Sequence, residues 1–80
     1  MCVRVILLGK LADGMDGGEL DLPAPLDWRT LLAHLPRPLA EAAAGEQVKV
    51  AVDGALLPEK TTLQAAEGSE VALLPPVSGG

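Results

Sequence analysis

Residues 48–57 read VKVAVDGALL, and this stretch predicts the feature from which the rest of the fold follows. Two apolar runs flank Asp53-Gly54, a dipeptide that favours the type I′ turn of a two-residue hairpin because both turn positions take a positive φ. The stretch therefore predicts two antiparallel strands. A lone hairpin is only marginally stable, so further strands and a cover for the apolar face are needed.

A second strand pair is predicted at the beginning of the chain. Residues 2–8, CVRVILL, are rich in β-branched side chains, and residues 19–23, ELDLP, form a shorter run with Leu20 and Leu22 directed inward. The turn-rich residues 9–18 join them as a loose hairpin. Alternation along the first strand separates Val3, Val5 and Leu7 on one face from Cys2, Arg4, Ile6 and Leu8 on the other.

Helical signals occupy the middle of the chain. Asp27 is a favoured N-cap for residues 28–35, WRTLLAHL, and Pro36 ends that helix. Residues 37–45 predict a second, shorter helix, with a proline tolerated in its first turn and Gly45 as its end. The first helix carries an apolar stripe that must cover a sheet, formed by Trp28, Leu31, Leu32 and Leu35.

The end of the chain completes the predicted sheet. Residues 61–70, TTLQAAEGSE, indicate a helical turn and a loop, and residues 70–74, EVALL, the last strand. This order predicts a single α+β domain over residues 1–76: a ubiquitin-like β-grasp fold, with a mixed sheet and one main helix packed across one face. Residues 77–80 are expected to form a flexible C-terminal tail.

Composition excludes several classes of function. The net charge of -5, with only six Lys and Arg in 80 residues, argues against nucleic-acid binding. No apolar run approaches the roughly 18 residues of a membrane span, and the N-terminal run is too short for a signal peptide, so we expect a cytoplasmic protein without membrane contact. The single cysteine, Cys2, allows no internal disulfide and no cysteine metal site, and we expect it to be a small buried hydrophobe.

The sequence of the predicted domain contains no recognisable catalytic or cofactor motif. It lacks a phosphate-binding GxxxxGK[ST] motif, so any ATP must be used by a partner. His34, the only histidine, has no nucleophile beside it and suits a helix end. The eleven carboxylates are scattered over predicted loops and polar faces, and Trp28 is expected in the core. We therefore expect the chain to bind neither cofactor nor metal.

The C-terminal residues 75–80, PPVSGG, favour a functional interpretation. Pro75 and Pro76 lack an N–H, so they end the β-ladder after Leu74 and direct the chain away along an extended path. Residues 77–80 then reach roughly 13 Å, and glycines without Cβ atoms can enter a narrow active site. For an arbitrary protein, a frayed end or a residual linker would be the preferred interpretation.

A resemblance to a known family decides between these interpretations. The stretch VKVAVDGALLPEKTTLQAAEGSEVALLPPVSGG resembles the small subunit of molybdopterin synthase, a ubiquitin-like sulfur carrier. The resemblance begins with VRVILLGKLAD and is strongest in LLPPVSGG, which matches the family's hydrophobic pair, Pro-Pro, Val, Ser or Thr, and Gly-Gly. Thiamin-pathway carriers and ubiquitin also end in Gly-Gly but usually lack Pro-Pro. Leu73 and Leu74 stand where the family usually has phenylalanines, and Asp53 where it often has asparagine.

The resemblance implies a chemical role for the terminal glycine. An E1-like adenylyltransferase would use ATP to convert the Gly80 carboxylate into an acyl adenylate, and a sulfurtransferase would supply sulfur to leave a thiocarboxylate. Within the heterotetramer formed with the large subunit of molybdopterin synthase, that sulfur would pass to cyclic pyranopterin monophosphate in molybdenum cofactor synthesis. The catalytic acids and bases would belong to the large subunit, and this chain would be a sulfur-donating subunit.

Two sets of site residues follow. Gly80 would carry the covalent chemistry and Gly79 would give access, after a guided stalk formed by Pro75, Pro76, Val77 and Ser78. If the first and last strands are neighbours, Ile6, Leu8 and Leu74 share an apolar face that is predicted to dock on the large subunit. Other functions stay open: a ubiquitin-like modifier that passes Gly80 to a lysine amine, a thiamin-type carrier, or a binding module that works without its tail.

Overall fold

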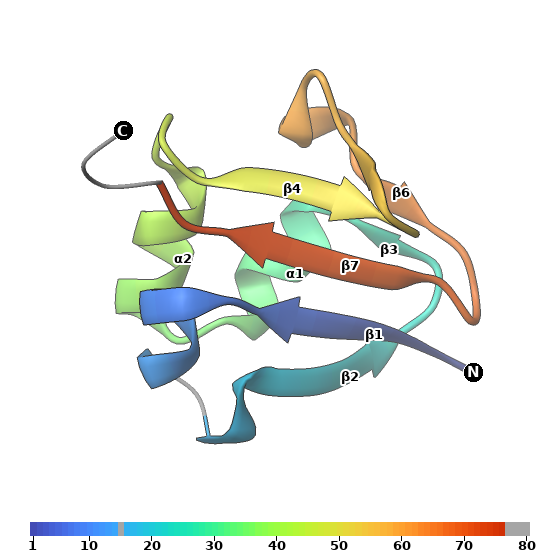
Figure 1. Cartoon of the computed structure of the whole chain (residues 1–80). Coiled ribbons are helices and arrows are strands. Elements are labelled where there is room, and N and C mark those ends of the chain that lie inside the picture. Colours follow the sequence, from blue (N-terminus) through green and yellow to red (C-terminus); the bar gives the residue numbers. More distant parts are fainter. Residues whose placement is uncertain (15, 77–80) are drawn as a thin grey trace.

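The computed structural model describes residues 1–14 and 16–76, which form seven strands, two α-helices and three short 3₁₀ segments (Figure 1). The strands are β1 (Cys2–Leu7), β2 (Glu19–Pro23), β3 (Leu26–Asp27), β4 (Lys49–Val52), β5 (Ala55–Leu56), β6 (Gln64–Ala65) and β7 (Glu70–Leu74). The helices are α1 (Trp28–His34) and α2 (Arg37–Ala44), and the 3₁₀ segments are η1 (Gly9–Gly14), η2 (Asp16–Gly18) and η3 (Lys60–Thr62).

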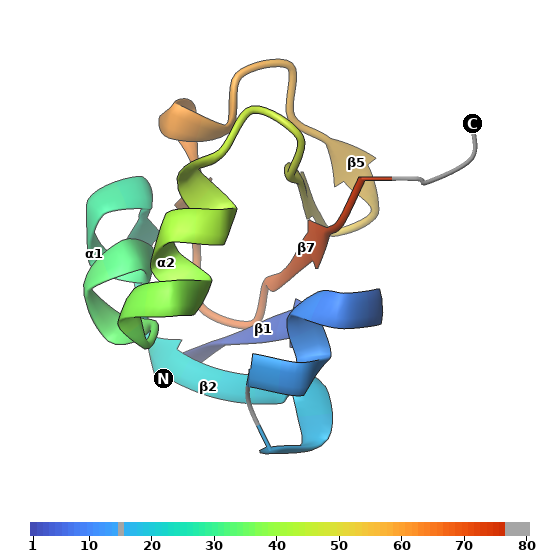
Figure 2. The ribbon, with the colours of Figure 1, turned by 90° about the vertical axis from the view of Figure 1, so that its left-hand side faces the viewer.

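Five of the strands form a mixed sheet in the order β2-β1-β7-β4-β5. The central pair, β1 and β7, is parallel, and the other neighbours are antiparallel. Both helices lie against the same face of this sheet (Figures 1 and 2). The arrangement confirms the α+β, ubiquitin-like β-grasp fold. The cover is shared by two helices of seven and eight residues, instead of resting on the first one alone.

The hairpin predicted at residues 48–57 is present as β4 and β5. Asp53 and Gly54 both have positive φ values, 50° and 85°, as a type I′ turn requires. The Asp53 carboxylate also accepts a 2.9 Å hydrogen bond from the backbone N–H of Glu70, and the Asp53 N–H donates to the Glu70 carbonyl at 2.8 Å. The turn is thereby fastened to the beginning of the neighbouring strand β7.

The core lies between the sheet and the helices and is built from Leu, Val and Ala. Every second side chain of the strands points inward and forms one side of the core, and buried residues of the two helices form the other side. Asp27 caps α1 as predicted, because its carboxylate accepts a 2.8 Å hydrogen bond from the Thr30 N–H. The buried residues are Val3, Val5, Leu7, Leu11, Leu22, Leu26, Leu31, Leu35, Leu39, Ala43, Val48, Val50, Leu63, Ala65, Val71 and Leu73.

One lysine, Lys60, contacts both helices and the loop that follows α2. The ammonium of Lys60 donates hydrogen bonds to the carbonyls of Ala43 (2.8 Å), Val48 (2.9 Å) and Gly45, and the Ala43 carbonyl lies in the last turn of α2, where carbonyls have no partner within the helix. It also lies 5.7 Å from the centre of the Trp28 ring, which is half-buried against the core. Partial burial lowers the pKa of Lys60. The contacts hold the loop after α2 in place.

Two further features differ from the sequence-based expectations. Residues 64–65, expected in a loop, form β6, which pairs with β3 as a small second sheet. Strands of two residues are too short to give a periodic pattern. The expectation that Cys2 is buried is wrong, because it is exposed. Cys2 alternates with the fully buried Val3 and therefore points to the sheet face that neither helix covers.

Candidate functional site: the open sheet face and the start of the tail

Strand β7 ends at the residue that the sequence indicated. Leu74 still pairs with Lys49 of β4, and on the other side the Leu8 N–H donates to the Leu73 carbonyl at 3.1 Å. Pro75 has no N–H to continue either ladder. Pro75 is half-buried and Pro76 is exposed. The chain therefore leaves the sheet at Leu74, between the ends of β1 and β4.

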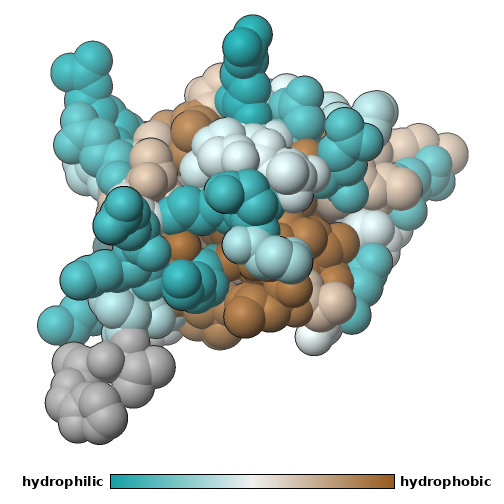
Figure 3. Space-filling model, turned by 90° about the horizontal axis from the view of Figure 1, so that it is seen from above, coloured by the Kyte–Doolittle hydropathy of each residue, from teal (hydrophilic) through white to brown (hydrophobic). Residues whose placement is uncertain are grey.

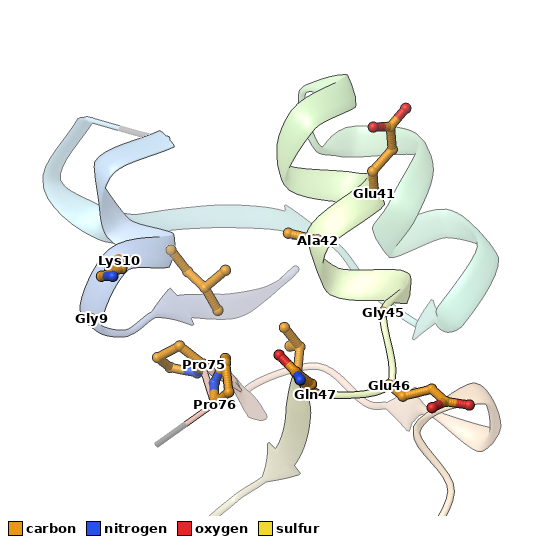
Figure 4. Close-up of a pocket in the computed structure, with 11 residues that line it drawn as sticks. Gly9, Lys10, Glu41, Ala42, Gly45, Glu46, Gln47, Pro75 and Pro76 are labelled. Carbon is orange, nitrogen blue, oxygen red and sulfur yellow. The ribbon is translucent and has the colours of Figure 1, made fainter. Parts of the chain in front are cut away.

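A cavity of about 760 Å³ adjoins this exit (Figure 4). Figure 4 shows Pro75 and Pro76 beside Gly9 and Lys10, with Ala42 of α2 across from them. The wall is completed by Leu11, Glu41, Gly45, Glu46, Gln47 and Val48. Because Lys60 holds the carbonyls of residues 45 and 48, the loop that forms this wall is fixed to the body of the domain.

The face of the sheet opposite the helices carries a continuous apolar row. Ile6 of β1 is the register partner of Ala72 on β7, which is the partner of Ala51 on β4, which is the partner of Leu56 on β5. Register partners share one face, so these four side chains lie side by side across four strands. Leu56 is 60% exposed, and the other three are half-buried. We call this face the open face.

Leu8 and Leu74 extend the apolar row toward the tail. Each lies one step beyond the register pair Leu7–Leu73, so they end neighbouring strands on the open face. Leu8 is 39% exposed and Leu74 is half-buried. Figure 3, a view from above, shows apolar side chains gathered on the side of the molecule that carries this face. The open face and the exit of the tail are thus continuous.

Charged side chains border the apolar row of the open face. On the β2 side of the row, the Arg4 Nε lies 3.8 Å from a carboxylate oxygen of Asp21 and 4.0 Å from one of Glu19, which is the register partner of Ile6. All three side chains are more than half exposed, so these ion pairs stabilise the fold very little. At the tail end, Lys49 pairs with Leu74 and Lys10 lines the cavity. Such a rim around an apolar centre is typical of protein interfaces.

The structure brings together the predicted residues that it describes. Ile6, Leu8 and Leu74 lie on the open face, and Pro75 and Pro76 follow directly. Their role in docking stays a prediction. Val77, Ser78, Gly79 and Gly80, on which the predicted chemistry depends, lie outside the described residues.

Sequence reasoning missed three residues of the open face. Ala51, Ala72 and Leu56 were not singled out, because only the first and last strands were considered as neighbours. The two-residue turn at Asp53-Gly54 already contained the signal, since it fixes the hairpin register that sets Leu56 opposite Ala51.

The body of the domain offers little chemistry of its own. Within residues 1–14 and 16–76, no group of three or more His, Cys, Asp or Glu side chains is placed to hold a metal ion. His34 is exposed, with its Nδ1 2.9 Å from the Thr30 carbonyl of its own helix. None of the helices in the described part of the chain combines the length and apolar character that crossing a membrane requires.

Known proteins are similar to this chain in sequence or in fold. A model of the ThiS family matches residues 5–80. A search of curated proteins finds no match to the chain. Among solved structures, the chain is similar to small archaeal modifier protein 1 from Haloferax volcanii, with 20% identity and a TM-score of 0.71 over the whole of both chains. It is similar to the Methanosarcina acetivorans protein of the same name, with 21% identity and a TM-score of 0.77 over 99% of this chain and 96% of that one.

A further similarity involves a complex of two proteins. The chain matches a chain in the complex of subunits 1 and 2 of the molybdopterin-converting factor from Helicobacter pylori 26695. The two chains are 25% identical, with a TM-score of 0.67 over the whole of both.

Proposed function

The chain belongs to the ThiS family of sulfur carriers with a β-grasp fold, and from this premise we propose that it is the small, sulfur-donating subunit of a cytoplasmic molybdopterin synthase. One observation carries the proposal: the Pro-Pro segment that begins the Gly-Gly tail leaves the sheet directly beside the open apolar face. A partner that docks on this face meets the tail at a defined point. The similarity to a chain of the Helicobacter pylori molybdopterin-converting factor supports this choice of partner.

The first step of the proposed reaction activates the tail. A carboxylate oxygen of Gly80 attacks the α-phosphate of ATP in an E1-like adenylyltransferase, and pyrophosphate leaves. A sulfurtransferase then delivers sulfur as a nucleophile at the sulfide oxidation level, which attacks the acyl carbon and expels AMP. The product is a thiocarboxylate on Gly80. This chain contributes a carboxylate that an extended stalk holds at a fixed reach from the docked domain.

In the second step the sulfur is transferred. The open face docks on the large subunit, and the tail enters that subunit's active site, where the acids and bases are supplied. The thiocarboxylate sulfur attacks a carbon of cyclic pyranopterin monophosphate and displaces an oxygen substituent from it, which leaves a thioester between the two molecules. Water then attacks the acyl carbon and the C–S bond to Gly80 breaks, so the sulfur stays on the pterin as a thiol and Gly80 regains its carboxylate. In this step the residues of this chain bind the large subunit, orient the thiocarboxylate and exclude water. The open face and Pro75–Pro76 set the geometry.

The test changes the length of the tail. Deleting Gly80, or adding one alanine after it, leaves the sheet intact because the change lies beyond the last ladder residue, Leu74. Gly79→Val introduces a bulky side chain where a narrow slot expects bare backbone. Each variant is incubated with the E1-like enzyme, ATP and a sulfur donor, and intact-protein mass spectrometry detects replacement of one oxygen by sulfur. We expect this increase only in the unmodified chain, with equal thermal unfolding of all variants as the control.

Other outcomes separate the remaining candidates. An alanine-extended chain that gains sulfur and supports molybdopterin formation contradicts the terminal-glycine mechanism. A thiocarboxylate that forms but is not consumed by the large subunit points to a carrier for another pathway, such as the thiamin type. Covalent conjugates through Gly80 to lysine amines in cell extract indicate a ubiquitin-like modifier.

A further inference from the structure

The turn after β1 lies against the start of the tail because of the sheet topology. Strands β1 and β7 are parallel neighbours, so both end at the same edge of the sheet. The Leu8 N–H donates to the Leu73 carbonyl at 3.1 Å, and the Leu11 N–H donates to the Leu8 carbonyl, also at 3.1 Å. These bonds fix η1, the segment that begins at Gly9, to the last residues of β7.

Gly9 has two independent reasons to be glycine. Its φ is +57°, a conformation that residues with a Cβ adopt at some energetic cost. In addition, a Cβ at this position would lie 2.9 Å from Cγ of the Pro75 ring, closer than such atoms approach in proteins. Gly54 shares the positive φ, at +85°, but a Cβ there would meet nothing within 4 Å. The close contact with the tail therefore distinguishes Gly9 from Gly54.

The segment that touches Gly9 is stiff. Proline fixes φ at Pro75 and Pro76, and a following proline restricts Leu74 and Pro75 to extended conformations. Because the segment is stiff, a displacement of Pro75 also moves Pro76. The four residues after Pro76 can span at most roughly 13 Å, so the position and direction of Pro76 limit the region that their end can reach.

The neighbouring cavity gives Pro75 room to move. Gly9, Pro75 and Pro76 all border the cavity of about 760 Å³, and Pro76 is exposed. A side chain at position 9 can therefore displace the two prolines into open space without unpacking Leu73, which is fully buried. We expect redirection of the tail, with the fold retained.

We propose that Gly9 is a positioning residue: its bare backbone forms a seat for the Pro75 ring, and this seat sets the direction in which the tail leaves the domain. The inference rests on the proposed function for its consequence, because a carrier must deliver the Gly80 carboxylate to one fixed point relative to its docked face. Gly9 acts through Pro75 and touches no reacting atom.

The test compares Gly9→Ala with Gly54→Ala. Both place a Cβ at a positive φ, so both should lower the melting temperature, and Gly9→Ala somewhat more because it also displaces Pro75. Only Gly9→Ala should slow thiocarboxylate formation by the E1-like enzyme. A displacement approaching 1 Å predicts a fall in kcat of the order of a hundredfold, with KM nearly unchanged because the docking face is intact. Equal kcat values for wild type and Gly9→Ala, or equal losses in both variants, overturn the proposal.

A double variant tests the contact itself. Pro75→Ala removes the ring carbon nearest Gly9 and should lower kcat by itself. In that background, Gly9→Ala should have little further effect, because the two changes disrupt the same contact. Independent, multiplicative losses would show that the Pro75 ring is not the group that Gly9 accommodates, and would overturn the proposal.

One measurement needs no partner enzyme. In the isotopically labelled wild-type chain, nuclear Overhauser effects should connect the Gly9 Hα atoms with the ring protons of Pro75, and these should be weakened and the Pro76 signals shifted in Gly9→Ala. If this contact is absent from the wild-type chain, the proposal that Gly9 accommodates the Pro75 ring is wrong. If the wild-type chain shows this contact but gains no sulfur, the proposed function fails and the seat stands.

Discussion

The two faces of the main sheet differ in composition and in burial: the inner face is apolar, and the open face carries an apolar row bordered by charged side chains. On the inner face, Val and Leu side chains of β1, β7 and β4 are fully buried or nearly so, namely Val3, Val5, Leu7, Val71, Leu73 and Val50. On the open face, the same three strands place Ile6, Ala72 and Ala51 side by side, half-buried and uncovered by either helix. The two helices therefore cover the inner face, and they leave the open face uncovered.

The difference shows that one strand alternation can serve two purposes. A strand that only separates core from water would place polar residues on its outer face. Here two alanines form a flat centre, and larger side chains at Leu8, Leu74 and Leu56 stand around it. A flat apolar surface with a polar rim suits a second protein. We infer that the inner face stabilises the domain and the open face serves recognition.

The largest expected effect tests this division of roles within one dipeptide. Leu73→Ala removes a fully buried side chain, so we expect the free energy of unfolding to fall by about 2–5 kcal/mol. The matched variant Leu74→Ala, on the open face, should cost less than about 1 kcal/mol. Urea titration measures both. Equal losses at the two positions would contradict the division.

A charge on the open face should separate binding from stability. Leu74→Glu should weaken binding to the large subunit by about 2 kcal/mol or more, because docking would desolvate an unpaired carboxylate. The control is Ala33→Glu, which places the same charge on an exposed position of α1, away from the open face. Isothermal titration calorimetry measures both affinities, and circular dichroism checks the fold. Unchanged affinity for Leu74→Glu would remove the open face as the docking surface.

The smallest expected effect concerns the helix cover of the inner face in acid. The hydrogen bond from the Thr30 N–H lowers the pKa of Asp27 below its ordinary value of 3.8. A lowered folded-state pKa contributes stability that is present above pH 3.8 and is lost as the pH falls through the folded value. Asp27→Asn keeps a capping oxygen but cannot titrate, so its melting temperature should fall less steeply below pH 3.8 than that of the wild type.

The control for this measurement is Glu67→Gln, which removes an exposed carboxylate outside the helices. The melting temperature of Glu67→Gln should fall below pH 3.8 about as steeply as that of the wild type. If Asp27→Asn and Glu67→Gln behave alike, the cap does not contribute to the acid dependence.

Much of the fold could be predicted because its signals are local. Asp53-Gly54 fixed the hairpin turn, Asp27 and Pro36 marked the limits of α1, and Pro75 marked the end of the last ladder. One outcome was beyond this reasoning, because the pairing of β3 with β6 involves two-residue strands that give no periodic pattern. Two others have local signals: alternation with the buried Val3 places Cys2 on the open face, and the two-residue turn at Asp53-Gly54 sets Leu56 opposite Ala51.

For the candidate site, the sequence by itself determined the tail: its composition, its two prolines and the residue at which the ladder ends. The tertiary structure decided what surrounds the start of that tail. Gly9 and Pro75 are 66 positions apart in the chain, and a cavity wall from α2 and its loop lies beside them. The physical reason is that turn chemistry and alternation depend on neighbouring residues. The close approach of Gly9 to Pro75 depends instead on the parallel pairing of β1 with β7, which is fixed only when the sheet assembles against its helices.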